Sequence, residues 1–307
     1  MVRLGANRYG KAEVRVVRVA RGAAPDGGDL LREWNVSTSL SGDLTDTHLT
    51  GDNAKVLPTD SQKNRVYALA KELGAVEPEA FGLELASFFV SSQESITRAR
   101  VEIEEYGWTP VGATGYSFAR SGDLVRTTTV IVDASLGTSV VSGIRDLTVM
   151  NTTASEFWGY PKDPYTTLPE TRDRILATTV NAAWRYRPSA IAGAPRDSGE
   201  AARVPGEGDW GSQFAAARLA VLATFAGTYT YSLQQMLYAI GSAVLAAVPA
   251  ACEVRLALPN KHHYLVDLAP FGLANEREVY QAGDRPYGLI EGTVLADDAP
   301  DAGIAWS

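Results

Sequence analysis

The sequence predicts an antiparallel α+β fold that consists of two successive units, each with two strands, two helices and two further strands. Three observations support this prediction. Segments with alternating apolar residues occur in pairs, segments with helical spacing of apolar residues follow the first pair, and the whole order occurs twice in the 307 residues. The length suits two domains of ordinary size, and we expect a division into residues 1–140 and 141–307.

The first unit opens with two predicted strands, EVRVVRV at 13–19 and WNVSTSL at 34–40. A helix is predicted at 59–74, because apolar residues recur there at helical spacing between a Thr-x-x-Gln capping box and a glycine. A second helix is predicted at 77–89, which has a proline in its first turn. Strand composition returns in two segments that complete the unit, TRARVEIEEY at 97–106 and LVRTTTVIVD at 124–133.

The second unit repeats this order without obvious sequence identity, with one strand segment more at its end. Strands are predicted at 138–150 and 178–187, and helices at 212–227 and 232–244. The stretch 187–209 is rich in proline, glycine, alanine and charged residues, which predicts a long mobile surface loop. A sheet with helices on one face leaves its other face and its edges uncovered, so we expect the units to join and the chain to oligomerise. Three further segments with strand composition close the unit: CEVRLAL at 252–258, HHYLVDL at 262–268 and YGLIEGTVL at 287–295.

The composition argues against several classes of partner. A net charge of -8 and a pI near 5.0 do not suit nucleic acid or an anionic membrane, both of which select basic surfaces. The longest apolar run, 239–251, is too short to span a membrane and contains Pro249, and no apolar segment follows Met1. The single cysteine, Cys252, is predicted to be a core residue, which leaves neither a disulfide framework nor a cysteine metal cluster. We therefore expect a soluble, cytoplasmic protein.

Several polar residues near the ends of these elements have a structural explanation when each is taken alone. Lys11 stands just before the first strand, where a solvated lysine is common. Thr59 can be the N-cap of the first helix, with Gln62 as its capping-box partner. His262 and His263 are neighbours in a predicted strand, so they face opposite sides and cannot both reach one metal ion. The sequence also has neither a Gly-x-Ser-x-Gly elbow nor a glycine-rich phosphate loop.

Six blocks of sequence together form a more specific pattern than any one of these residues. They are NRYGKAEVRVVRV at 7–19, GDNAKVLPTDSQKN at 51–64, SEFWGYPKDPYTTLPETRDRILAT at 155–178, SLQQMLY at 232–238, LPNKHHYLVDL at 258–268 and DRPYGLIEGTV at 284–294. In this order the blocks resemble the urate oxidase family, nearly from end to end. The sequence departs from the family at Pro58, where an alanine is common, in the length of the 187–209 loop, and over 108–122.

The resemblance implies the tunnelling fold, whose repeated ββααββ unit agrees with the order predicted above. It also implies a homotetramer with active sites at subunit interfaces, and an oxidoreductase that needs no metal or other cofactor. The implied reaction oxidises urate with dioxygen and water to 5-hydroxyisourate and hydrogen peroxide.

The resemblance further implies which residues form the site. Lys11, Thr59 and His262 would form a proton relay, in which Lys11 draws the hydroxyl proton of Thr59 so that a proton can leave urate. The residues implied to bind urate or dioxygen are Asp60, Phe157, Arg174, Leu233, Gln234 and Asn260.

The residue types in this set suit a flat, electron-rich purine. The guanidinium fork of Arg174 would pair with one edge of urate, and the amide of Gln234 would offer a donor and an acceptor to another edge. Phe157 would stack on the ring, and Asn260 with Thr59 would hold dioxygen. Without the resemblance, Arg174 would be taken for a surface helix arginine, Gln234 for a solvent-facing residue and Phe157 for a core residue.

Two alternatives remain at this point. One is another tunnelling-fold enzyme that acts on a purine or a pterin, although the zinc-dependent members need cysteine and histidine ligands that the sequence lacks. The other is a non-catalytic purine-binding homologue, which would need the substrate-binding residues but not Lys11, Thr59 and His262. All three relay residues are present.

Overall fold

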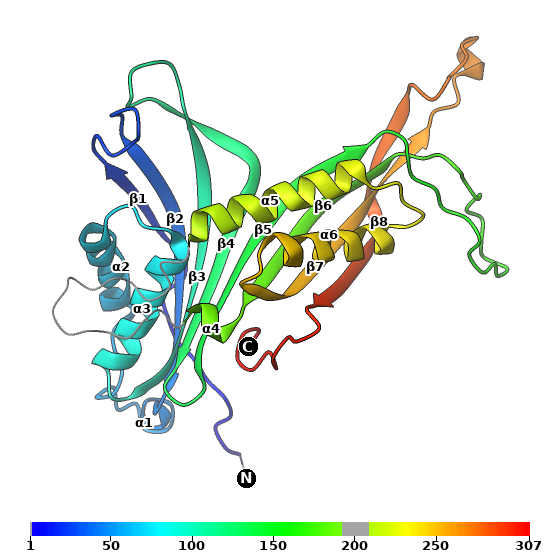
Figure 1. Ribbon diagram of the computed structural model, residues 1–307. Helices are drawn as coiled ribbons and strands as arrows, with labels where there is room; N and C mark the ends of the chain where they lie inside the picture. Colours follow the sequence, from blue (N-terminus) through cyan, green and yellow to red (C-terminus); the bar gives the residue numbers. More distant parts are fainter. Residues whose placement is uncertain (1, 192–208) are drawn as a thin grey trace.

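The structure is a computed structural model that describes residues 2–191 and 209–307 (Figure 1). Its first half contains β1 (Val14–Ala20), β2 (Leu30–Gly42), α1 (Thr45–Leu49), α2 (Thr59–Leu73), α3 (Pro78–Ser92), β3 (Ile96–Pro110) and β4 (Phe118–Asp133). Its second half contains β5 (Gly137–Asn151), β6 (Leu176–Tyr186), α4 (Pro188–Ile191), α5 (Trp210–Gly227), α6 (Leu233–Ala247), β7 (Ala251–Leu265), the short 3-10 helix η1 (Ala269–Phe271) and β8 (Tyr280–Leu295).

The eight strands form one antiparallel sheet, in which the spatial order from β1 to β8 is the same as the order along the chain. The longer helices lie along one face of this sheet (Figure 1). Helix α2 packs on β1, α3 on β3 and β4, α5 on β5, and α6 on β7 and β8. These observations confirm the predicted α+β class with two successive units. The division at residues 140 and 141 stays a prediction, because a continuous sheet connects the two halves.

The core lies between the sheet and the helices. In the first half the rings of Trp34 and Phe81 are fully buried, with their centres 4.8 Å apart. In the second half Tyr186 meets Trp210 edge to face at 4.7 Å. Cys252 is also buried, as predicted.

The strand β7 is longer than the sequence suggested. The segment CEVRLAL and the first four residues of HHYLVDL, predicted here as parts of two separate strands, form this single strand, which ends at Leu265. Pro259 lies between them, at an interruption of the β6–β7 ladder. On one side of the interruption Ala257 pairs with Asn181, and on the other side Asn260 pairs with Thr178. A proline is tolerated there because no ladder hydrogen bond needs its missing N–H. The prediction of two strands was therefore wrong.

The predicted loop at 187–209 falls mostly on residues 192–208, which lie outside the described residues. Within residues 2–191 and 209–307, no helix combines the length and the apolar character that crossing a membrane requires.

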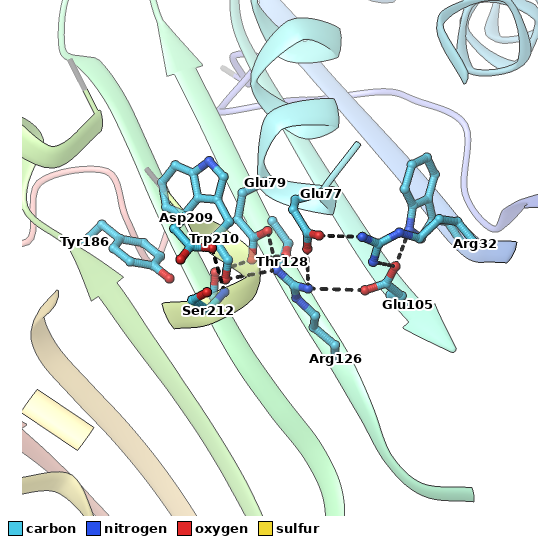
Figure 2. A network of polar contacts seen from close by, with 12 residues as sticks. Arg32, Glu77, Glu79, Glu105, Arg126, Thr128, Tyr186, Asp209, Trp210 and Ser212 are labelled. Carbon is cyan, nitrogen blue, oxygen red and sulfur yellow. Dashed lines mark hydrogen bonds and ion pairs between the residues drawn. The ribbon is translucent and has the colours of Figure 1, made fainter. Parts of the chain in front are cut away.

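A buried network of charged side chains lies between the sheet and α3 (Figure 2). Arg126 on β4 forms ion pairs with Glu77 at 2.6 Å, with Glu79 at 2.7 Å and with Glu105 on β3 at 3.4 Å. Arg32 on β2 pairs with Glu105 at 2.7 Å and also with Glu77. Two guanidinium groups thus share three carboxylates.

The same network connects the two halves of the chain. Glu79 accepts a hydrogen bond from Ser142 on β5 at 2.5 Å, and Arg126 donates one to the carbonyl oxygen of Trp210, where α5 begins. Burial raises the pKa of Glu79, although Arg126 and Ser142 act in the opposite direction. Strands and helices from both halves therefore depend on one set of buried charges.

Candidate active site

Lys11 lies just before β1, and its backbone is bound to β2. The amide of Lys11 donates to the hydroxyl of Thr38 at 3.1 Å, and the amide of Thr38 donates to the carbonyl oxygen of Lys11 at 2.9 Å. The Thr38 hydroxyl donates to Oε1 of Gln62 on α2 at 2.7 Å. This chain of contacts holds Lys11 beside the helix that begins at Thr59.

Gly10 allows this close approach of the two segments. A Cβ atom at this position would lie 1.7 Å from the carbonyl oxygen of Thr38. Any larger residue would push the segment away from β2, and Lys11 with it.

The predicted capping box at the start of α2 is wrong. Pro58 is the N-cap and makes no side-chain capping hydrogen bond, and Thr59 is already the first helical residue. Gln62, the predicted partner, is fully buried and bonded to Thr38. Among the described residues, the Thr59 hydroxyl has no hydrogen-bond partner, so it is available for other chemistry.

Asp60 follows Thr59 on the exposed side of α2. Its carboxylate forms an ion pair with Lys63 and accepts a hydrogen bond from Asn64 at 3.0 Å. The hydrogen bond from Lys63 lowers the pKa of Asp60, and the charge of Lys11 acts in the same direction. Lys11, Thr59 and Asp60 thus form one group.

Phe157 and Arg174 lie in the loop 152–175, which connects β5 to β6. Phe157 exchanges backbone hydrogen bonds with Thr171 at 2.8 and 3.0 Å, and the Cζ atom of Arg174 lies 5.1 Å from the centre of the Phe157 ring. The Nε atom of Arg174 donates to the hydroxyl of Ser155 at 3.2 Å. Burial lowers the pKa of Arg174, although a guanidinium keeps its charge at neutral pH. Arg174 is therefore a partly buried loop residue rather than a surface helix residue.

The start of α6 lies beside this loop. The amide of Glu156 in the loop donates to the carbonyl oxygen of Thr230 at 2.8 Å. Two residues later Ser232 caps α6, because its side chain accepts a hydrogen bond from the amide of Gln235. Leu233 is buried and Gln234 is exposed in the first turn. The exposed amide of Gln234 therefore belongs to the same region as Phe157.

Asn260 and His262 flank an irregularity in the sheet. Asn260 pairs with Gly288 of β8, but His262 pairs with Gly283, so the register shifts between them. Such a bulge changes the direction of the neighbouring side chains. On the other side of β7, Asn260 pairs with Thr178, four residues after Arg174. Asn260 and His262 thus lie on the strand next to the one that Arg174 precedes.

The rings of His262 and Tyr264 stack with their centres 6.0 Å apart, on the same side of β7. His263 then faces the other side, because neighbouring residues of a strand alternate. Among the described residues, no group of three histidine, cysteine, aspartate or glutamate side chains is arranged to hold a metal ion.

One chain does not bring all of these residues together. Lys11, Thr59 and Asp60 lie at the β1 edge of the sheet, whereas the other six predicted site residues lie near β6, β7 and the start of α6. Four strands separate β1 from β6, which at about 4.8 Å per strand step corresponds to roughly 24 Å along the sheet. In Figure 1, α2 and the loop 152–175 lie at opposite ends of the molecule.

Residues 7–131 and 140–291 match the family model that is described as Uricase. The chain belongs to the uricase family. It is 40% identical over 304 residues to a uricase from Arthrobacter globiformis, which covers 99% of this chain and 93% of the relative. It is 35% identical to a uricase from Dictyostelium discoideum, with 94% and 96% covered.

Solved structures of uricases have the same fold. The crystal structure of uricase from Arthrobacter globiformis matches with a TM-score of 0.87 at 41% identity, and the match covers 98% of this chain and 97% of that chain. These comparisons confirm the predicted family and an enzyme of the urate oxidase class.

Sequence reasoning missed two residues whose contacts involve the segments of the candidate site: Thr38, which binds Lys11 and Gln62, and Glu156, which binds Thr230. The sequence did indicate that Thr38 is unusual, because this polar residue stands at a position of the strand that alternation predicts to be buried, between the apolar residues Val36 and Leu40. Such a polar residue needs a partner, which is Gln62. Glu156 left no comparable signal, because its partner Tyr229 lies 73 residues away.

Proposed function

We propose that this chain is a urate oxidase that converts urate, dioxygen and water to 5-hydroxyisourate and hydrogen peroxide, with neither a metal nor an organic cofactor. Membership of the uricase family supports the substrate and the type of reaction. The single observation that carries the mechanism is the separation of the predicted site residues into two groups at opposite ends of the sheet.

The group near β6 and β7 suits a planar anion. Arg174 offers a guanidinium fork whose desolvation strengthens its pairing with a carbonyl oxygen and a ring nitrogen. Phe157 offers an aromatic face beside that fork, and Gln234 offers an amide that can accept and donate at a second edge. Asn260 on β7 would hold dioxygen, and later water, above the ring. Leu233 is buried at the start of α6 and would anchor the turn that carries Gln234.

The group near β1 suits proton transfer. Thr59 carries a hydroxyl that is not used as a helix cap, and Lys11 is held beside α2 by Thr38 and Gln62. An ammonium cannot accept a proton, so Lys11 acts as a base only as the neutral amine. His262, from the other group, would extend the relay.

Because the two groups are about 24 Å apart in one chain, each complete site would combine Lys11, Thr59 and Asp60 of one chain with the other six residues of a second chain. The strands β1 and β8 are the edges of the sheet and are open to pairing. A homotetramer closes such edges and contains a site at each of the interfaces between paired chains. Light scattering should therefore give the mass of four chains, and an active monomer would contradict the proposal.

The decisive experiment follows urate absorbance and peroxide release by the purified protein in the presence of a chelator, with no added cofactor. Urate should disappear as peroxide forms in equal amount. A protein that binds urate under these conditions without forming peroxide would be the non-catalytic homologue. Activity that requires an added metal would overturn the cofactor-free mechanism.

A further inference from the structure

Glu156 stands directly before Phe157, and its carboxylate is largely enclosed. Only 13% of its side chain is exposed. The carboxylate accepts hydrogen bonds from the Tyr229 hydroxyl and from Nε1 of Trp158, both at 2.5 Å, and Arg172 lies 3.6 Å from it. Neither the substrate-binding nor the relay role described above uses this carboxylate.

Glu156 joins two segments through both its backbone and its side chain. Its amide donates to the carbonyl oxygen of Thr230, and its carboxylate binds the neighbouring Tyr229. Both partners lie in the turn that leads into α6 and Gln234. Neighbouring residues of an extended segment point to opposite sides, so the direction of Glu156 also determines that of Phe157.

The charge state of this contact suits a strong hydrogen bond. The hydrogen bond from Tyr229 lowers the pKa of Glu156, and the same bond raises the pKa of Tyr229 to about 12. At neutral pH an ionised carboxylate therefore accepts from a protonated phenol, which is the stronger, charge-assisted kind of hydrogen bond.

We propose that Glu156 is a positioning residue that holds the aromatic face of Phe157 at a set distance from the amide of Gln234. The inference rests on the proposed function, because urate would be held between these two groups. Glu156 itself faces away from the substrate and acts only through Phe157 and the turn before α6.

The variant Glu156→Ala should raise KM for urate on the order of 10- to 100-fold, because misplaced binding groups lose affinity even when none of them is removed. The value of kcat should change much less, since Lys11, Thr59 and His262 belong to the other chain or to β7. Dissociation constants for urate measured without dioxygen should follow KM. Glu156→Gln should have an intermediate effect, because its amide keeps one acceptor but offers a donor where the second acceptor was.

Two further variants test the contact itself. Tyr229→Phe removes only the hydroxyl and should raise KM less than Glu156→Ala, and the double variant should be no worse than Glu156→Ala alone. Asp163→Ala is the matched control. Asp163 is a carboxylate of the same loop, but it binds Thr166 and the amide of Tyr165 within the loop. Its loss should leave KM unchanged.

If Glu156 only stabilises the loop, Glu156→Ala should lower the melting temperature and leave KM and the dissociation constant unchanged, which would overturn the inference. A crystal structure of Glu156→Ala gives a readout that does not depend on urate. Phe157 and the turn at 229–231 should separate in it, and unmoved positions would also overturn the inference. Failure of the wild type to oxidise urate would instead overturn the proposed function.

Discussion

Arg126 and Glu79 form an ion pair of 2.7 Å in the interior of the protein, between β4 and the first turn of α3. Glu79 is fully buried, and only 7% of the Arg126 side chain is exposed. Arg126→Met should therefore lower the free energy of unfolding by about 3–5 kcal/mol, because it leaves buried carboxylates without a partner. Urea denaturation at neutral pH measures this loss.

Arg218→Met is the control for Arg126→Met, since Arg218 forms an exposed pair with Asp123 and should contribute at most about 1 kcal/mol. Equal losses in the two variants would show that the buried network adds nothing beyond a surface pair.

Thr59→Ala should leave stability almost unchanged, within about 0.5 kcal/mol, because Thr59 does not cap α2. As a catalytic hydroxyl, Thr59 should nevertheless be needed for turnover, and its loss should lower kcat about 100-fold or more. Thr59→Ser, which keeps a hydroxyl, should retain most of the activity. Steady-state kinetics and thermal melts of both variants decide the matter, and full activity of the alanine variant would exclude the relay role.

Lys11→Met should also lower kcat about 100-fold or more, while the dissociation constant for urate stays close to that of the wild type. Lys11 and Thr59 act together in the proposed relay, so the double variant Lys11→Met/Thr59→Ala should be little worse than the worse single variant. Multiplicative losses in kcat would mean that the two residues act independently.

Mixing two inactive variants should restore activity if each site combines residues of two chains. Lys11→Met changes the residue group near β1, and Arg174→Met changes the group near β6 and β7. When one chain of each variant forms a pair, one of the two sites contains both changes and the other contains neither. Random reassociation of equal amounts should recover about a quarter of the wild-type activity. The variants are mixed in denaturant and refolded together, with each variant refolded alone as control. Absence of any recovery, despite mixed assemblies in native mass spectra, would place the whole site within one chain.

The ionised carboxylate of Asp133 should stabilise the folded protein at neutral pH and lose this contribution in acid. Burial raises its pKa, but the amides of Ser135 and Leu136 and the guanidinium of Arg98 outweigh this effect, so the pKa is well below its usual range. For a carboxyl group with a lowered folded-state pKa, the contribution is complete above the unfolded value of about 3.9 and is lost as the pH falls towards the folded value.

The stability difference between wild type and Asp133→Asn should therefore be largest near neutral pH and shrink below about pH 4. Urea midpoints at pH 7 and pH 3, measured at one protein concentration, test this. A difference that is the same at both values would mean that the hydrogen bonds, and not the charge, are responsible.

Hydrophobic periodicity predicted the elements well because burial of one face is a local property of a segment. In α6, Met236, Ile240 and Val244 recur at helical spacing and are all buried. Contacts between distant segments could not be obtained in this way. Gln62 completes a convincing local capping pattern, yet it is buried against Thr38 of β2, because tertiary packing outweighs a hydrogen bond of modest energy.

The arrangement of the candidate site was likewise beyond local patterns. Resemblance to a family named the residues, but the distance between Lys11 and Arg174 depends on the order of strands in the sheet. The sequence of hydrophobic and polar residues is the same for any strand order. Only the assembled sheet shows that, within one chain, the two residues lie far apart across the sheet, one beside β1 and the other just before β6.

The agreement between strand order in the sheet and strand order in the chain has a consequence for synthesis. Every strand after the first can pair with its predecessor as soon as it leaves the ribosome, without waiting for a later segment to be inserted between them. The sheet should therefore grow in one direction from β1, and each new strand should bring the next helices onto the same face. Limited proteolysis of ribosome-bound chains that stop after β4 or after β6 should find the earlier strands already protected, and exposed chains at both lengths would show that the sheet forms only after release.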